Sequence, residues 1–411
     1  MQTGARFGSV LLAYLVAVAL VITLVPFEFI RPATLRFDLT VAPSDVIANV
    51  LLFFPLGFLA RLSFGARGGR LAWRILLAGL LLSGAIECLQ EFERARFPSP
   101  IDVATNGVGV WFGAMVHDRV VRRLAVDAGL LGRLSLELPL MGIVYLLIPL
   151  LWLDSLAIGG TAERVLLTVP LGLFGVVVLT SIHRHQWHLS GTLSHAELAL
   201  LAGGWFLVGA FPALPERPVL MAVVALIITG TAFLLALSPR WLAEDRRYEV
   251  WAIRRGLPFL AAYLLVLATP LGPFGPSSQL NWTLGIGEEA GTVTILRYLE
   301  LLGGLTLLGY IIAELRGRRE ERFRKSVAIV CLWVVPPVTF CEVLRGFEPG
   351  GAGAGRWLSL IAGALFGALV YHLQRDHVRA LVELRIRAIS FPAIERGSGH
   401  SAGLSSAART D

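Results

Sequence analysis

Apolar residues occupy this chain in twelve long runs, which short polar or charged segments separate. Each run has about the 20 residues that a helix needs to cross a hydrocarbon core about 30 Å thick. Inside lipid the backbone must satisfy its own hydrogen bonds, so each run is predicted to be an α-helix. The runs cover residues 8–27, 46–64, 71–91, 102–121, 138–155, 162–182, 194–212, 218–238, 256–272, 294–314, 326–345 and 356–373. The pattern predicts an all-α, polytopic transmembrane bundle of about 12 spans.

The composition agrees with a membrane protein. Of the 411 residues, 55% are hydrophobic and 16% are charged, whereas soluble domains carry about 25% charged residues. The basic residues follow the predicted spans: 27 of the 36 Lys and Arg fall in the N-terminal segment, the C-terminal tail and the loops on the same side. Cytoplasmic loops collect Lys and Arg, so both termini are predicted to be cytoplasmic. This bias explains the net charge of +7 without a nucleic-acid partner.

Polar residues recur in a pattern only at the ends of the second, third and fourth runs. The pattern consists of Asp45, Asn49, Glu87, Gln90, Arg96, Asp102 and Asn106. Apart from Arg96 in the connecting loop, they form pairs three or four residues apart, which share one face of a helix. The alternation of spans places all of them at the outer side of the membrane. Because polar groups at membrane depth are costly and usually functional, we expect them to converge on a site near the outer interface.

Two interpretations of this set remain open. Asp45 or Asp102 alone suits a helix cap, and Asn can join membrane helices, so the set could be an internal network. The same groups could instead form a pocket for a polar headgroup, a sugar, or a phosphate with a divalent cation. The glycines Gly57, Gly109 and Gly113 are predicted to permit close helix packing. No cofactor is expected, and the three cysteines have no spacing typical of a metal site.

The C-terminal part of the chain echoes the N-terminal part. Residues 342–348 compare with residues 87–93, and glycines four apart follow in both places, Gly109 and Gly113 and then Gly363 and Gly367. The two copies are separated by an even number of spans, so they would cross the membrane in the same direction and form parallel repeats. We therefore predict four regions. They are a four-helix membrane domain at 1–125, a central transmembrane region of unassigned role at 126–250, a degenerate second repeat at 251–380, and a cytoplasmic tail with a disordered end at 381–411.

The stretch from Asp45 to Gly113 resembles the VanZ-like family of bacterial membrane proteins. The resemblance rests on the polar set above, in its order and spacing, and on the segment Phe53-Phe54-Pro55-Leu56-Gly57. It implies a multi-pass protein of the bacterial inner membrane with its polar cluster facing outward. The namesake is associated with low-level resistance to the glycopeptide teicoplanin, without altered peptidoglycan precursors. No settled catalytic mechanism goes with the family, and this chain is longer than the namesake, so only the location is carried over.

Three functions compete on this evidence. The first is binding or processing of a polar lipid or a polyprenyl- or sugar-linked envelope precursor; in an enzyme, Glu87 or Asp102 would be the general base and Arg96 would hold a phosphate or carboxylate. The second is a transporter or flippase, which should need polar residues deeper than Asn49 and Asn106. The third is a scaffold without chemistry of its own. The sequence contains no recognisable catalytic motif, so no reaction is predicted. Membrane lipids are the expected partners.

Overall fold

The computed structural model describes most of the chain. The described residues are 2–25, 28–31, 42–64, 69–93, 98–126, 128–157, 164–190, 193–237, 248–268, 282–283, 292–317, 322–347 and 351–398. Arg96 and residues 399–411, the predicted disordered end, lie outside them.

This part of the chain contains twelve α-helices, and each overlaps one of the twelve predicted runs. Their bounds are α1 Gln2–Leu24, α2 Pro43–Phe64, α3 Gly69–Gln90, α4 Pro100–Val126, α5 Ala128–Ala157, α6 Val165–Ser190, α7 His195–Gly209, α8 Pro218–Leu237, α9 Tyr248–Ala268, α10 Thr292–Gly317, α11 Phe323–Arg345 and α12 Ala354–Ser398. The predicted all-α fold of a multi-pass membrane protein is confirmed.

Ten of these helices are long and apolar enough to cross a membrane, and α4 and α7 are the two that are not. Helix α7 has 15 residues, or about 22 Å at 1.5 Å per residue, which is short for a span. Helix α7 ends at Gly209, before the end of the predicted run 194–212, and a 3₁₀ turn that contains Pro212, Phe211–Ala213, follows it. Helix α4 is long but less apolar, since it carries the polar groups that face α2 and α3.

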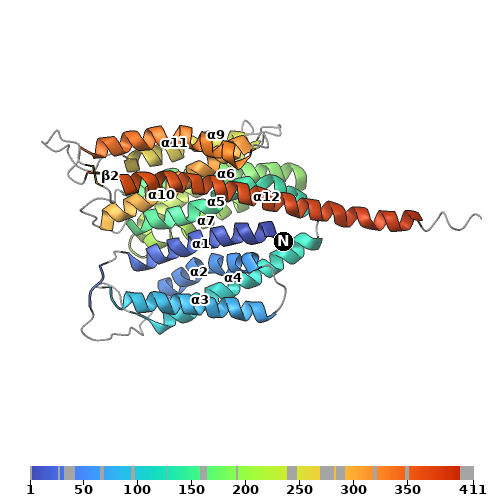
Figure 1. Cartoon of the computed structure of the whole chain (residues 1–411), viewed down its shortest axis with the longest axis horizontal. Helices are drawn as coiled ribbons and strands as arrows, with labels where there is room; N and C mark the ends of the chain where they lie inside the picture. Colours follow the sequence, from blue (N-terminus) through green and yellow to red (C-terminus); the bar gives the residue numbers. More distant parts are fainter. Residues whose placement is uncertain are drawn as a thin grey trace, which may run out of the picture.

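The helices lie side by side along the long axis of the molecule (Figure 1). Helices α2, α3 and α4 form a group on one side, and α1 lies between them and the rest. A small hydrophobic cluster lies within α1–α4. A large one joins α5–α12 and also includes Phe7 and Leu11 of α1 and Leu59 of α2, so it connects the two groups. At one end, on the left in Figure 1, α1, α3 and α11 finish and α2, α4, α10 and α12 begin. We call this the distal end.

Glycines allow the closest helix approaches in the bundle. A Cβ added at Gly57 of α2 would collide with the backbone of Val110 in α4, and one at Gly113 of α4 would collide with the carbonyl of Phe54. A Cβ at Gly109 would lie 2.7 Å from the Val50 carbonyl oxygen. Backbone-to-backbone contact of this kind is typical of small residues at membrane helix interfaces.

Helices α10 and α12 meet in the same manner. A Cβ at Gly309 of α10 would collide with the backbone of Ala364, and one at Gly367 of α12 with the carbonyl of Thr306. Gly363 faces the Leu302 side chain, where an added Cβ would approach to 2.6 Å. The α10–α12 pair thus packs through the same glycine-to-backbone contacts as the α2–α4 pair.

Helix α12 is the longest element, with 45 residues. Its C-terminal part projects beyond the other helices (Figure 1). The predicted cytoplasmic tail begins at residue 381, and α12 continues through its first part to Ser398. At the distal end a two-residue parallel pairing joins β1, Trp282–Thr283, to β2, Ala352–Gly353, just before α12.

Candidate functional site at the distal end

The described residues of the predicted polar set lie at the distal end. Asp45 and Asn49 are in the first two turns of α2, Glu87 and Gln90 are in the last turn of α3, and the other two open α4. Arg96 lies between α3 and α4, outside the described residues. Three short helix ends therefore carry the six remaining members of the set.

Glu87 fastens the end of α3 to the beginning of α4. Its side chain is buried, and Oε2 accepts a hydrogen bond of 2.7 Å from the backbone N–H of Ser99, the residue before α4. A carboxylate at a helix N-terminus is favoured by the helix dipole, and a charge-assisted bond is stronger than a neutral one. This geometry gives Glu87 a structural task that its sequence context did not predict.

The amides of the set join helices. Asn106 donates from Nδ2 to Ser83 Oγ of α3 over 2.8 Å, and Asn49 donates to Thr105 Oγ1 of α4 over 3.3 Å. Together with the Glu87 bond, these contacts connect α2, α4 and α3 at one level. The structure therefore brings Asn49, Glu87 and Asn106 together through intervening hydroxyl and backbone groups.

The remaining members are arranged differently. Gln90 is buried and donates to the Thr23 carbonyl over 2.8 Å, which ties α3 to the end of α1. Asp45 is exposed, and Ser44 Oγ donates to it over 3.4 Å. Asp102 is half-buried at the start of α4 and makes polar contacts of its own. Asp45 thus lies at the rim of the cluster.

Several acceptors in this cluster are buried without a hydrogen-bond partner among the described residues. They are Asn106 Oδ1, Ser99 Oγ and both carboxylate oxygens of Glu93. Glu93 is 3% exposed; it follows α3 and pairs with Phe29 in an isolated antiparallel bridge. Buried polar groups are almost always hydrogen-bonded in proteins, so unpartnered acceptors at one location need an explanation. Together they offer acceptors to a ligand that carries hydrogen-bond donors.

Sequence reasoning missed Ser83, Ser99, Thr105 and the site role of Glu93. Hydroxyl residues are common in apolar helices, where they bond to their own backbone, so nothing in the pattern singled them out. Glu93 was noticed only as part of the echo with residues 342–348. The only usable signal was its position, six residues after Glu87 and just beyond the end of α3.

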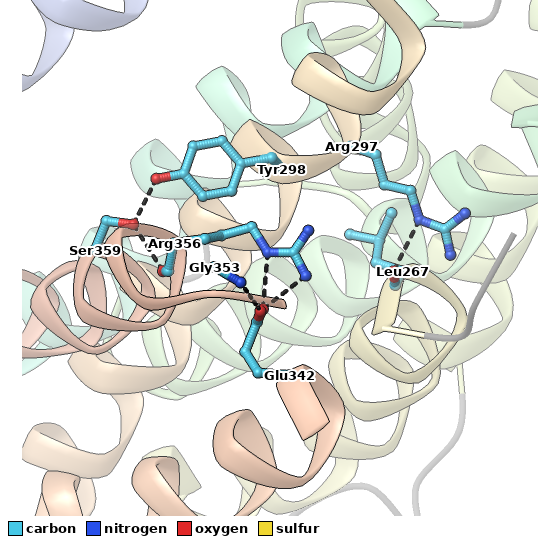
Figure 2. A network of polar contacts seen from close by, with 7 residues as sticks. All are labelled: Leu267, Arg297, Tyr298, Glu342, Gly353, Arg356 and Ser359. Atoms are coloured by element: carbon cyan, nitrogen blue, oxygen red, sulfur yellow. Dashed lines mark hydrogen bonds and ion pairs between the residues drawn. The ribbon is translucent and has the colours of Figure 1, made fainter. Parts of the chain in front are cut away.

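A second polar cluster at the distal end lies between α10, α11 and α12 (Figure 2). Arg356 donates from Nε to Glu342 Oε1 over 2.8 Å, and Nη2 lies 2.7 Å from the same oxygen. The Gly353 N–H donates to Glu342 Oε2 over 3.4 Å. Ser359 donates to the Arg356 carbonyl and shares a hydrogen bond with the hydroxyl of Tyr298.

Arg297 completes that second cluster on the side of α9. Its Nε and Nη2 donate to the carbonyls of Leu267 and Val266, over 2.8 and 2.9 Å. These carbonyls end α9, where the helix dipole is negative. Figure 2 shows Arg297 turned toward Leu267 and Arg356 turned toward Glu342.

Comparison with known proteins identifies one region. Residues 7–121 match the VanZ/LLP1 family model, a range that extends from α1 through most of α4. No curated protein and no solved structure matches the chain.

Proposed function

We propose that the VanZ-like region, residues 7–121, which match the VanZ/LLP1 family model, binds the polar headgroup of an envelope lipid or lipid-linked glycan precursor. The protein would lie in the bacterial inner membrane with both termini cytoplasmic, so that the distal end faces outward. The observation that carries the proposal is the group of buried, unpartnered acceptors among the described residues at that end: Asn106 Oδ1, Ser99 Oγ and the carboxylate of Glu93.

The chemistry of these groups narrows the ligand. Carboxylate and amide oxygens accept hydrogen bonds, so they fit a headgroup rich in hydroxyl or amine donors, such as a sugar or an amino sugar. A bare phosphate would be repelled by the carboxylates of Glu87, Glu93 and Asp102. We therefore favour the glycan part of a precursor over its phosphate as the group that the described residues bind.

The proposal includes an internal duplication, in which α9–α12 repeat α1–α4. Glycines make backbone contact at matching places in the α2–α4 and α10–α12 pairs. Glu342 accepts from the Gly353 N–H as Glu87 accepts from the Ser99 N–H. The last helix of each unit also has a matching hydroxyl. Thr105 of α4 donates to the carbonyl of Asp102, and Ser359 of α12 donates to the carbonyl of Arg356.

This duplication separates fold-determining residues from ligand-binding ones. Features shared by both units, namely the glycines, the Glu and the hydroxyl, serve the common fold. Features present in only one unit are not needed for that fold. When the two units are aligned on their glycines, Asn49 corresponds to Leu301, Asp102 to Arg356 and Asn106 to Leu360. Asn49, Asp102 and Asn106 are thus the strongest candidates for ligand recognition, while Glu87 mainly holds α3 and α4 together.

Mass spectrometry of the lipids retained by the purified full-length protein tests the proposal. Wild type should retain a glycosylated lipid that Asn106→Leu loses, because leucine is the aligned residue of α12 and cannot hydrogen-bond. Ser359→Ala, at the same level of the C-terminal unit, should leave the inventory unchanged. Equal inventories from wild type and an equally stable Asn106→Leu protein would refute binding at this site.

A carrier is the second candidate, because the structure places charged residues inside the bundle outside the VanZ-like region. Glu300 and Glu314 of α10 are both buried, and Glu314 lies 14 residues further from the distal end than Glu300. Either function could change glycopeptide susceptibility by altering access to a precursor at the outer leaflet. A scaffold remains the alternative if neither a lipid nor a solute is bound.

A further inference from the structure

Four buried polar side chains meet where the central helices contact the C-terminal unit. They are Asp154 near the end of α5, Arg164 just before α6, Tyr263 of α9 and Glu300 of α10. Asp154, Tyr263 and Glu300 are 0% exposed, and the Arg164 side chain is 13% exposed. Tyr263 interacts electrostatically with each of the other three, so the four form one cluster.

Hydrogen bonding in this cluster is incomplete. Arg164 Nη2 pairs with Glu300 Oε2 at 2.7 Å. Within the described part of the chain, both carboxylate oxygens of Asp154, Oε1 of Glu300 and the hydroxyl of Tyr263 have no hydrogen-bond partner, and neither has Nη1 of Arg164. Four buried oxygens from three helices are therefore available to a ligand.

The two carboxylates of the cluster differ in how they are paired. Glu300 pairs with Arg164. Arg297 interacts with Glu300 electrostatically, but its Nε and Nη2 donate to the carbonyls that end α9. Asp154 is repelled by Glu300 and attracted by Arg164, but no described arginine donates a hydrogen bond to it. A buried carboxylate in that position is strongly unfavourable unless something compensates it.

We propose that Asp154, Glu300 and Tyr263 bind a small monovalent cation such as Na⁺, with Arg164 positioning Glu300. Oxygen ligands from carboxylates and a hydroxyl suit a hard cation, and a cation supplies the Asp154 carboxylate with the partner that neither arginine provides. Glu300 follows the start of α10 by eight residues, which is about 12 Å along the helix axis. The site is thus nearer to the distal end than to the other end of the bundle.

This inference is independent of lipid binding by the VanZ-like region. The cluster contains no residue of α1–α4, and failure of either proposal leaves the other intact. A cation site between the central helices and α9–α10 is the kind of site that ion-coupled carriers place between structural units.

The thermal unfolding midpoint of the full-length protein in nanodiscs, measured against NaCl with choline chloride holding ionic strength constant, tests the site. A ligand that binds only the folded state raises the midpoint in a concentration-dependent manner. The wild-type midpoint should therefore rise with Na⁺ until it saturates. Asp154→Asn should abolish the response, and Tyr263→Phe should shift half-saturation severalfold upward. Asp118→Asn, which removes a carboxylate bonded to Arg61 in the VanZ-like region, should respond like wild type.

Two results would overturn the proposal. One is a wild-type midpoint that does not distinguish Na⁺ from choline, including the case in which it follows pH alone, since the carboxylates would then hold a proton. The other is an unchanged Na⁺ response in Asp154→Asn. If Asp154→Asn fails to fold, Tyr263→Phe decides, because loss of one hydroxyl leaves the charges in place.

Discussion

Individual side chains at the distal end differ in how completely they are bonded. Glu342 and Arg356 form a buried ion pair, whereas Asn106 uses its amide nitrogen and leaves its oxygen unpartnered among the described residues. The sequence was sufficient to find Asn106 because an amide in an apolar run is conspicuous. It could not show whether the amide is satisfied, since Ser83 belongs to another helix.

A substitution at the second cluster tests how strongly its ion pair is coupled. Arg356→Leu leaves the carboxylate of Glu342 buried without its cation, so we expect a loss of about 3–5 kcal/mol of stability. Adding Glu342→Gln removes the stranded charge and keeps an acceptor for the Gly353 N–H, so the double variant should recover most of the loss. Unfolding midpoints of both variants measure this. A double variant less stable than Arg356→Leu would show that the pair is not coupled.

Helices were predictable from the sequence to a large extent, because hydropathy and backbone hydrogen bonding in lipid dictate both their type and their approximate length. The bounds of individual helices were less predictable. Helix α7 ends at Gly209, where a 3₁₀ turn with Pro212 follows, and α12 continues beyond the predicted run to Ser398. The cluster of Asp154, Tyr263 and Glu300 was not predictable, since single polar residues in apolar runs far apart in the sequence give no sign of meeting.

The glycine contacts predict a large effect of one added methyl group. Gly113→Ala places a Cβ against the Phe54 carbonyl and should force α2 and α4 apart, with a loss of about 1–3 kcal/mol. Gly84→Ala is the matched control, because an added Cβ meets nothing within 4 Å in α3, and alanine favours a helix by about 1 kcal/mol. Thermal midpoints should fall for the first variant and hold or rise for the second. Equal midpoints would contradict the proposed backbone contact.

The whole molecule combines the four helices that match the VanZ/LLP1 family model, α1–α4, with the helices α5–α12, whose large hydrophobic core also takes in residues of α1 and α2. The glycine contacts of the first group recur in α9–α12, where the distal polar residues change from Asp and Asn to Arg and Leu. Under the proposed function, the first unit binds the headgroup at the outer face and the second unit is closed by its own ion pair. The central helices and α9–α10 then provide a separate cation site.

The most direct test of headgroup binding is the dissociation constant of a purified polyprenyl-linked glycan precursor for the full-length protein in nanodiscs. Wild type should bind, and Asn106→Leu should bind roughly tenfold more weakly, the change expected when about 1.4 kcal/mol of hydrogen bonding is lost. Ser359→Ala should bind like wild type. Equal affinity of wild type and a folded Asn106→Leu protein, or no binding by wild type, would contradict a headgroup site at the distal end of α2, α3 and α4.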